Sequence, residues 1–210
     1  MKLVFGGGDM ARAIGGVILG KDKCDVRIYK KVLENMERFK PDTVVVTAGI
    51  SHVANIKDSI PENWQEELEV NLLGSYHVAK AAADCGVKNM VFIASVAGLF
   101  GKPNHSGYSA SKGGVISLVE SLAMEGYNAY AISPGRVDTK MRQHDYPNDL
   151  PGTRLETNEI AKVVKDIEAG KYTSGDNIII RRIGFETAPI KVDRNEGWRA
   201  ELRVGEPVTL

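Results

Sequence analysis

Short, uninterrupted apolar segments alternate along this chain with longer segments in which apolar residues recur at helical spacing. Strands that are apolar on both sides are typical of a parallel sheet covered by helices on both faces, so the alternation predicts an α/β protein with a doubly wound parallel sheet. The predicted strands are Lys2–Phe5, Gly16–Leu19, Thr43–Thr47, Met90–Ile93, Ala129–Ser133 and Asn177–Ile180. The predicted helices are a short one from Met10 capped by Asp9, then Tyr29–Phe39, Glu62–Cys85, Gly107–Glu125 and Thr157–Ala169, the last capped by its threonine.

We expect a single domain over residues 1–182, because 210 residues with 43% hydrophobic content can bury one sizeable core. Cys24–Val26 follows the second predicted strand too closely for a full helix to fit between them, so this half of the sheet is abbreviated. Residues 183–210 break the alternation. They are expected to form an extension, either a hairpin around Trp198 and Val204 that packs on the domain or an oligomer contact.

Composition excludes several classes of function. Basic and acidic residues each number 27 and no basic run is present, so the chain lacks the phosphate-neutralising surface of a nucleic-acid-binding protein. No apolar run approaches the ~20 residues of a membrane-spanning helix, so no membrane association is expected. Cys24 and Cys85 lie in separate segments and the histidines are not spaced like metal ligands, so we expect a cytoplasmic protein without a metal site.

Ligands of a doubly wound sheet bind beyond the carboxyl ends of its strands, here at the loops after Phe5, Thr47, Ala94 and Ser133. The first loop has Gly6, Gly8 and Ala11 at the spacing G-x-G-x-x-A, in which small residues let backbone amides approach a pyrophosphate. A tight turn that binds nothing would show the same glycines. Gly20 and Lys21 follow the second strand without an acidic residue to hold a ribose 2′-hydroxyl, which favours NADP.

Three polar side chains near the third and fourth of these loops suit proton transfer. Tyr108 and Lys112 are four residues apart on a predicted helix, and Ser95 ends the strand before it. A phenol with a pKa near ~10 acts as an acid or base at neutral pH if a nearby ammonium, such as that of Lys112, lowers the pKa. Asn71 interrupts the apolar stretch Leu68–Leu72 and needs a hydrogen-bond partner. A solvated helix face and a structural amide would explain the same residues without catalysis.

Together these segments resemble the short-chain dehydrogenase/reductase family, with its Rossmann fold, from about Lys2 to Ile180. Tyr108-Ser109-Ala110-Ser111-Lys112 is similar to the family's Y-x-x-S-K segment, Ser95 lies 13 residues before the tyrosine, and Asn71 matches the family's helix asparagine. Further similar segments are Thr47-Ala48-Gly49 for the N-A-G turn, Pro134–Thr139 for the P-G loop, and Cys24-Asp25-Val26 for the adenine contact. Two departures are the alanines that replace the later glycines of Gly6–Ala13, and Thr47 in place of asparagine.

The resemblance implies an NAD(P)-dependent oxidoreductase that transfers a hydride between nicotinamide and a small alcohol or carbonyl substrate. It implies that Tyr108 is the general acid/base and that Lys112 lowers the pKa of Tyr108 and binds the nicotinamide ribose. Ser95 would polarise the substrate oxygen, and Asn71 would anchor a water that relays protons to Lys112. The cofactor, NADP or alternatively NAD, would contact Tyr108, Lys112, Gly6, Gly7, Gly8, Asp9, Met10, Ala11, Lys21, Asp25, Val26, Ala48, Gly49, Pro134, Gly135, Val137 and Thr139.

Two other functions fit parts of the pattern. The abbreviated segment before Cys24 resembles sugar-nucleotide reductases and epimerases of the family's extended branch, and a non-catalytic NAD(P)-binding sensor would share the fold. The complete tetrad favours an enzyme, because a sensor does not need a phenol beside a lysine. Family members commonly form homodimers or homotetramers, here through Glu62–Cys85 and Gly107–Glu125. Lys140–Glu156 is expected to be an irregular cover over the substrate, whose identity it does not reveal.

Overall fold

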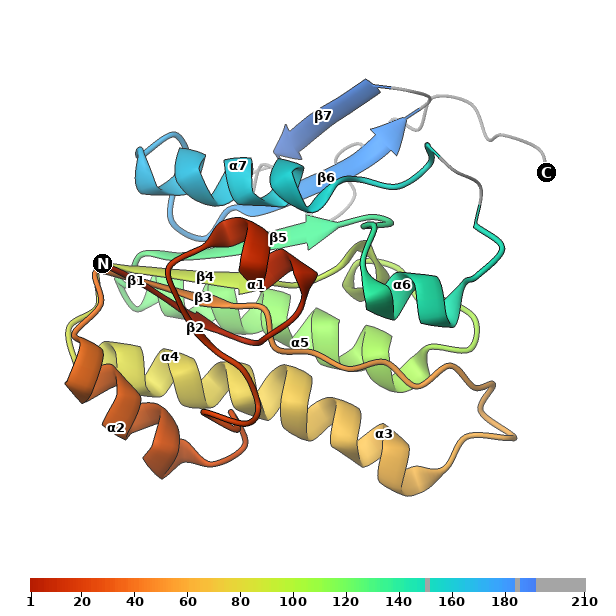
Figure 1. The fold of residues 1–210 in the computed structure, drawn as a ribbon, viewed down its shortest axis with the longest axis horizontal. Coiled ribbons are helices and arrows are strands. Elements are labelled where there is room, and N and C mark those ends of the chain that lie inside the picture. Colours follow the sequence, from red (N-terminus) through yellow and green to blue (C-terminus); the bar gives the residue numbers. More distant parts are fainter. Residues whose placement is uncertain (150–151, 184–185, 192–210) are drawn as a thin grey trace.

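The computed structural model describes residues 1–149, 152–183 and 186–191. Within these residues, seven strands form one sheet in the order β2-β1-β3-β4-β5-β6-β7 (Figure 1). All neighbouring strands are parallel except β7, which pairs antiparallel with β6 at one edge. The doubly wound parallel sheet is therefore confirmed. The strands are β1 Lys2–Phe5, β2 Val17–Leu19, β3 Thr43–Val46, β4 Asn89–Ile93, β5 Ala129–Pro134, β6 Asn177–Ile183 and β7 Glu186–Lys191.

Helices cover both faces of the sheet. Figure 1 shows α1 and α7 on one face and α2, α4 and α5 on the other, with α6 beyond the carboxyl ends of the strands. The α-helices are α1 Asp9–Ile14, α2 Tyr29–Phe39, α3 Pro61–Glu67, α4 Gly74–Asp84, α5 Ser106–Met124, α6 Lys140–Asp145 and α7 Thr157–Glu168. A π-helical segment, η1 Leu68–Leu73, joins α3 to α4, and a 3₁₀ turn, η2 Val96–Gly98, follows β4.

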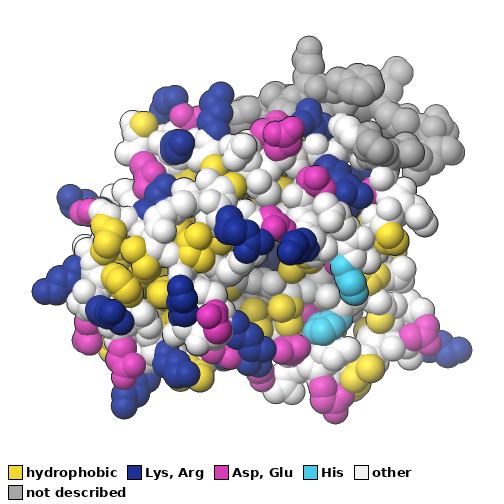
Figure 2. All heavy atoms as spheres, in the orientation of Figure 1, with side chains coloured by type: hydrophobic (Ala, Val, Ile, Leu, Met, Phe, Trp, Pro, Cys, Tyr) yellow, Lys and Arg dark blue, Asp and Glu magenta, His cyan; other side chains and the backbone are white. Residues whose placement is uncertain are grey.

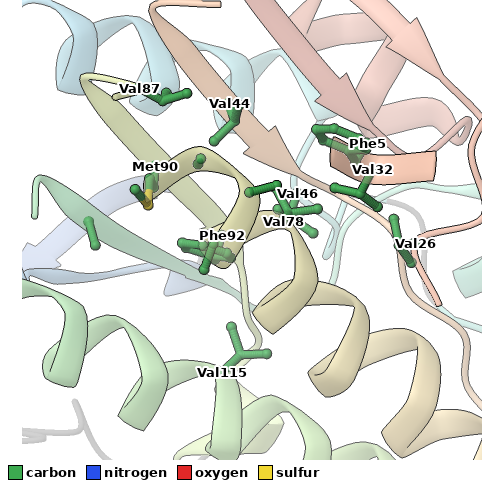
Figure 3. Close-up of a cluster of buried hydrophobic side chains, with 14 of the residues drawn as sticks. Phe5, Val26, Val32, Val44, Val46, Val78, Val87, Met90, Phe92 and Val115 are labelled. Carbon is green, nitrogen blue, oxygen red and sulfur yellow. The ribbon is translucent and has the colours of Figure 1, made fainter. Parts of the chain in front are cut away.

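Two hydrophobic cores lie on the two sides of the sheet because successive strand side chains point to opposite faces. In β3, Val44 and Val46 pack into the core under α2, α4 and α5, whereas Val45 packs into the core under α1 and α7. Figure 3 shows the first core, where the fully buried Phe5 and Phe92 lie among valines from both the strands and the helices. Each strand is therefore apolar on both sides, as its continuous run of apolar residues predicts.

Several helix ends differ from the sequence predictions. Gly8, and not Asp9, is the N-cap of α1, and Asp9 is the first helical residue. Glu156 caps α7 through a capping box with Glu159, so the predicted threonine cap is wrong. The segment from Lys140, predicted to be irregular, begins with helix α6, because the Thr139 hydroxyl accepts a hydrogen bond from the Arg142 amide at 3.2 Å.

The predicted helix Glu62–Cys85 contains the π-helical turn of η1, which no periodicity signalled. Between β2 and α2 the chain makes only turns, so the predicted absence of a helix there is confirmed. The antiparallel pair β6–β7 is a hairpin, whereas the predicted hairpin around Trp198 and Val204 lies outside the described residues.

The surface matches the balanced composition. On the face shown in Figure 2, lysine and arginine side chains are interspersed with acidic ones. Among the helices that the structure describes, none combines the length and the apolar character needed to cross a membrane.

Candidate active site

The loops at the carboxyl ends of β1 and β3 are in direct contact. Gly6 has a φ of 129°, and a Cβ atom there would lie 2.3 Å from Thr47 Oγ1 and 2.7 Å from the Ala48 nitrogen. Only glycine fits this conformation and this space. Thr47 Oγ1 donates a hydrogen bond of 3.2 Å to the Phe5 carbonyl, so the threonine links the two strands in place of the family's asparagine.

The rest of the glycine turn faces partly outward. A Cβ on Gly7 would lie 3.3 Å from the Gly20 Cα, whereas nothing lies within 4 Å of a Cβ on Gly8. The Arg12 guanidinium returns to this turn and donates to the Gly7 carbonyl at 2.7 Å and to Asp9 Oδ1 at 2.6 Å. The turn therefore has open space beside the Gly8 backbone and one cationic side chain, that of Arg12.

Asp9 connects the glycine turn to α6. Its Oδ2 accepts a hydrogen bond of 2.8 Å from the Lys140 amide, at the first residue of α6. This hydrogen bond, together with the Arg12 guanidinium, lowers the pKa of the Asp9 carboxyl. An ionised carboxylate thus holds the first loop of the sheet against the segment that follows the P-G loop.

The predicted adenosine-side residues lie between the glycine turn and α4. Lys21 is exposed. Asp25 is held by the Arg27 guanidinium, with Nε at 3.0 Å and Nη2 at 2.6 Å from its oxygens, and these hydrogen bonds lower the pKa of Asp25. Val26 is buried, and a Cβ on Gly74 would lie 2.5 Å from its Cγ2. The backbone there is fixed by close packing against α4.

Asn71 is fully buried in the π-helical segment η1. Its Oδ1 accepts from the Ile50 amide at 2.8 Å, and its Nδ2 donates to the Ile50 carbonyl and to Ser111 Oγ, both at 3.0 Å. These bonds use both amide hydrogens but leave one lone pair of Oδ1. π-Helical turns often occur at functional sites, and this one turns Asn71 toward α5 and the loop after β3.

Lys112 lies close to Asn71. A Cβ on Gly49 would be 3.4 Å from Lys112 Nζ and 3.4 Å from Asn71 Oδ1, so the two side chains flank the same glycine. Lys112 Nζ donates to the Ile93 carbonyl at 2.7 Å. Burial of this side chain, which is 4% exposed, lowers its pKa to about 8.

Tyr108 and Ser95 complete the group. The Lys112 ammonium lies 5.8 Å from the centre of the Tyr108 ring. Burial raises the pKa of Tyr108 to about 12, although a hydrogen bond with the Ser95 side chain acts in the opposite direction. The sequence led us to expect that Lys112 lowers the pKa of Tyr108. In the chain alone the effect of burial is larger, and the pKa is raised instead.

The P-G loop reaches the same edge of the sheet. Pro134 ends β5, and the Gly135 amide donates to the Ile180 carbonyl at 2.8 Å. Val137 is buried and pairs with Leu155, while Thr139 is the N-cap of α6. Through Lys140 and Asp9 this loop adjoins the glycine turn, so the structure brings together the loops that the sequence predicted to meet.

Sequence reasoning missed Glu67. It is 2% exposed, and its Oε1 accepts from the His52 amide at 2.7 Å. The carboxylate also accepts a hydrogen bond from the backbone amide of Tyr108, and burial raises the pKa of Glu67. Its position four residues before Asn71, on the same helical face, is the signal that could have identified it.

Sequence reasoning also missed a stack of rings beside Tyr108. The His105 and Tyr146 rings are 5.8 Å apart and nearly parallel, and Tyr146 Oη lies 2.9 Å from His105 Nε2. The Arg142 guanidinium is 3.7 Å from the centre of the Tyr146 ring. This stack holds the end of α6 against the start of α5.

No three histidine, cysteine or acidic side chains in the described ranges are grouped so that they could hold a metal ion.

Comparison with known proteins identifies several relatives. The profile of the short chain dehydrogenase family matches residues 18–149, which excludes the glycine turn. A 3-oxoacyl-[acyl-carrier-protein] reductase from Synechocystis is 30% identical over 68% of this chain and 60% of its own length. D-beta-hydroxybutyrate dehydrogenase from Cupriavidus necator is 28% identical over 92% of this chain and 81% of its own length. The match thus spans less than two thirds of the Synechocystis reductase.

Solved structures share the fold. A gluconate 5-dehydrogenase from Burkholderia cenocepacia, in complex with NADP and tartrate, superposes with a TM-score of 0.75 at 19% identity, covering 86% of this chain and 93% of its own. ElxO with bound NADP superposes with a TM-score of 0.71 at 20% identity, covering 83% of this chain and 94% of its own. A 3-oxoacyl-[acyl-carrier protein] reductase from Brucella melitensis with bound NAD gives 0.69 at 22% identity, covering 85% and 88% of the two chains.

Proposed function

Because this chain belongs to the short-chain dehydrogenase family, we propose that it is an NAD(P)-dependent oxidoreductase that acts on an alcohol or carbonyl group. The observation that carries the proposal is the convergence of Asn71, Ser95, Tyr108 and Lys112 at the carboxyl ends of the strands. The named relatives are reductases and dehydrogenases, which favours net oxidation or reduction over epimerisation.

The residues at the glycine turn fit a nicotinamide dinucleotide. Gly8 leaves open space beside the turn, and the Arg12 guanidinium, which also pairs with Asp9, lies at the same turn. Lys21, exposed after β2, favours NADP by its charge, and NADP is the cofactor bound to two of the structural neighbours. When bound, the nicotinamide supplies or accepts the hydride. The residues that would hold the cofactor are Gly6–Ala11, Lys21, Asp25, Val26, Ala48, Gly49, Tyr108, Lys112, Pro134, Gly135, Val137 and Thr139.

The chain's own residues handle the proton. The Tyr108 hydroxyl donates its proton to the substrate oxygen during reduction and takes it back during oxidation. Ser95 Oγ, which forms a hydrogen bond with the Tyr108 side chain, also forms a hydrogen bond with the substrate oxygen. Lys112 returns a proton to the tyrosine, and the free lone pair of Asn71 Oδ1 orients the water that serves Lys112.

We would test this by titrating purified protein with NADPH and NADH and following nicotinamide fluorescence, with Lys21→Glu as the matched variant. We expect NADPH to bind more tightly than NADH, with a selective loss of NADPH affinity in the variant. Absence of binding by both nucleotides, in folded protein free of retained cofactor, would require the oxidoreductase assignment to be withdrawn. Turnover on a panel of alcohols and carbonyls then separates an enzyme from a binding-only sensor.

We also propose that the protein is a homodimer or homotetramer formed through its long helices. Large apolar side chains are exposed on η1, α4 and α5, namely Leu73, Tyr76 and Met124. Exposed apolar residues on neighbouring helices are typical of interfaces. Sedimentation equilibrium should give a mass of two or four chains, and replacing Tyr76 and Met124 by charged residues should lower this mass.

A cytoplasmic location is consistent with Cys24 and Cys85, both free thiols, and subcellular fractionation would test this location.

A further inference from the structure

A pocket of about 430 Å³ lies beside the candidate catalytic tyrosine. Its wall is formed by the loop after β3, by α3, by the start of α5 and by the end of α6. Gly107, the residue before Tyr108, is part of this wall. The volume lies in the range of small-molecule sites. This pocket therefore adjoins the first turn of α5, the helix that carries Tyr108, and its lining residues do not include those of the glycine turn.

Two carboxylates in the pocket wall are buried without a lysine or arginine partner among the described residues. Glu67 is 2% exposed, and its hydrogen bonds with the described residues come from the backbone amides of His52 and Tyr108. The Asp145 side chain is 10% exposed, and its contact is with the exposed His144 ring at 3.1 Å. Burying a charge is costly unless an opposite charge accompanies it. The pocket therefore favours a cation from outside the chain.

The remaining wall suits an organic cation. Ser51 is in the wall, and its buried Oγ has no hydrogen-bond partner among the described residues. Trp64 is in the wall, and an indole ring attracts a cation. Among the described residues that line the pocket, none is a lysine or an arginine. In the described residues the acidic groups and histidines are not clustered as metal ligands, which argues against a metal ion.

Building on the proposed oxidoreductase function, we propose that this pocket binds the cationic end of the substrate, a protonated amine or quaternary ammonium on an alcohol or carbonyl compound. Asp145 and Glu67 both raise the pKa of Tyr108 through their negative charge. A cation seated between them and the tyrosine offsets this effect and favours the phenolate. The same charge would thus bind the substrate and adjust the proton-transfer group.

The test compares choline with 3,3-dimethylbutan-1-ol, which has the same shape without the charge. Affinity for the full chain would be measured by isothermal titration calorimetry. We expect choline to bind at least about tenfold more tightly, and Asp145→Asn to weaken choline about tenfold, because the quaternary ammonium loses the attraction of one opposite charge. The control is Asp166→Asn, which removes a carboxylate on α7 that pairs with Lys171. It should leave choline affinity unchanged.

Equal binding of choline and its neutral isostere would overturn the inference, and so would unchanged choline affinity in Asp145→Asn. Should that variant fail to fold by circular dichroism, Trp64→Leu tests the same pocket and should also weaken choline selectively. Turnover of neutral carbonyl compounds with NADPH is measured separately. Turnover without a preference for the cation rejects only the pocket assignment, whereas a cation preference without any turnover rejects only the oxidoreductase function.

Discussion

Replacement of Lys112 by methionine should make the protein more stable. Burial lowers the pKa of Lys112 from 10.5 to about 8, and each pKa unit corresponds to ~1.4 kcal/mol, so the ionised side chain costs the fold about 3 kcal/mol. Methionine has a similar length and no charge. It loses the 2.7 Å hydrogen bond to the Ile93 carbonyl, worth about 1 kcal/mol. The expected gain in the free energy of unfolding at pH 7 is therefore about 2 kcal/mol.

The gain should depend on pH in a defined direction. Below pH 8 the lysine is protonated in both the folded and unfolded chain, so folding buries the charge at full cost. Between pH 8 and 10.5 the folded chain has lost this proton but the unfolded chain has kept it, so the stability of the wild-type protein rises with pH. The advantage of Lys112→Met should shrink through that window and vanish before its upper end, because the wild-type protein keeps the hydrogen bond to the Ile93 carbonyl.

Urea unfolding followed by circular dichroism at several pH values from 7 to 10 measures this difference. Lys162→Met, at an exposed position of α7, is the control and should change stability little at any pH. A Lys112→Met variant that is less stable than wild type at pH 7, or a difference that does not vary with pH, would refute the reasoning.

Four further outcomes are expected. Tyr108→Phe should lower kcat by at least about 10²-fold with little change in NADPH affinity, measured by nicotinamide absorbance and fluorescence. In alcohol oxidation, kcat/KM should rise about tenfold per pH unit from pH 7 to 10, because the phenol ionises with a pKa of about 12; a plateau near neutral pH would contradict this. Gly6→Ala should lower the unfolding free energy by about 1–3 kcal/mol in urea titrations, because its Cβ would meet Thr47 Oγ1 at 2.3 Å. Glu156→Ala should cost about 1 kcal/mol by the same assay, through loss of the α7 capping box.

Most of the fold follows from hydrophobic pattern. Tyr29–Phe39 was predicted with the bounds that the structure has, because its apolar stripe ends where Pro41 and Asp42 interrupt the helical spacing. The helix caps were less predictable. Residue type makes Asp9 and Thr157 good caps, but the backbone leaves the helical region one residue earlier in both cases. Helix α6 was missed because it buries none of its residues and so shows no apolar period.

The candidate catalytic group could be proposed from the sequence because its members stand at fixed offsets, as Ser95 and Tyr108 do. The features around it were not, because they depend on contacts between distant segments. Glu67 looks like any glutamate of a surface helix, and its burial is set by Gly107, where a Cβ would lie 2.2 Å from Glu67 Oε2. The π-helical turn at Asn71 likewise shows no period of its own in the sequence.

In the proposed mechanism, the charge states of Tyr108 and Lys112 determine whether the site is ready for carbonyl reduction or for alcohol oxidation. Burial disfavours the phenolate and the ammonium alike, so at neutral pH the tyrosine holds its proton firmly. A protonated phenol beside Ser95 is ready to donate to a carbonyl oxygen, whereas alcohol oxidation must first remove that proton. A positive charge next to the tyrosine makes alcohol oxidation easier relative to carbonyl reduction. It does so because it stabilises the phenolate, which the charges of Asp145 and Glu67 disfavour. If Tyr108 is the proton-transfer group that we propose, the balance between reduction and oxidation therefore depends on the charge of the molecule that binds beside it.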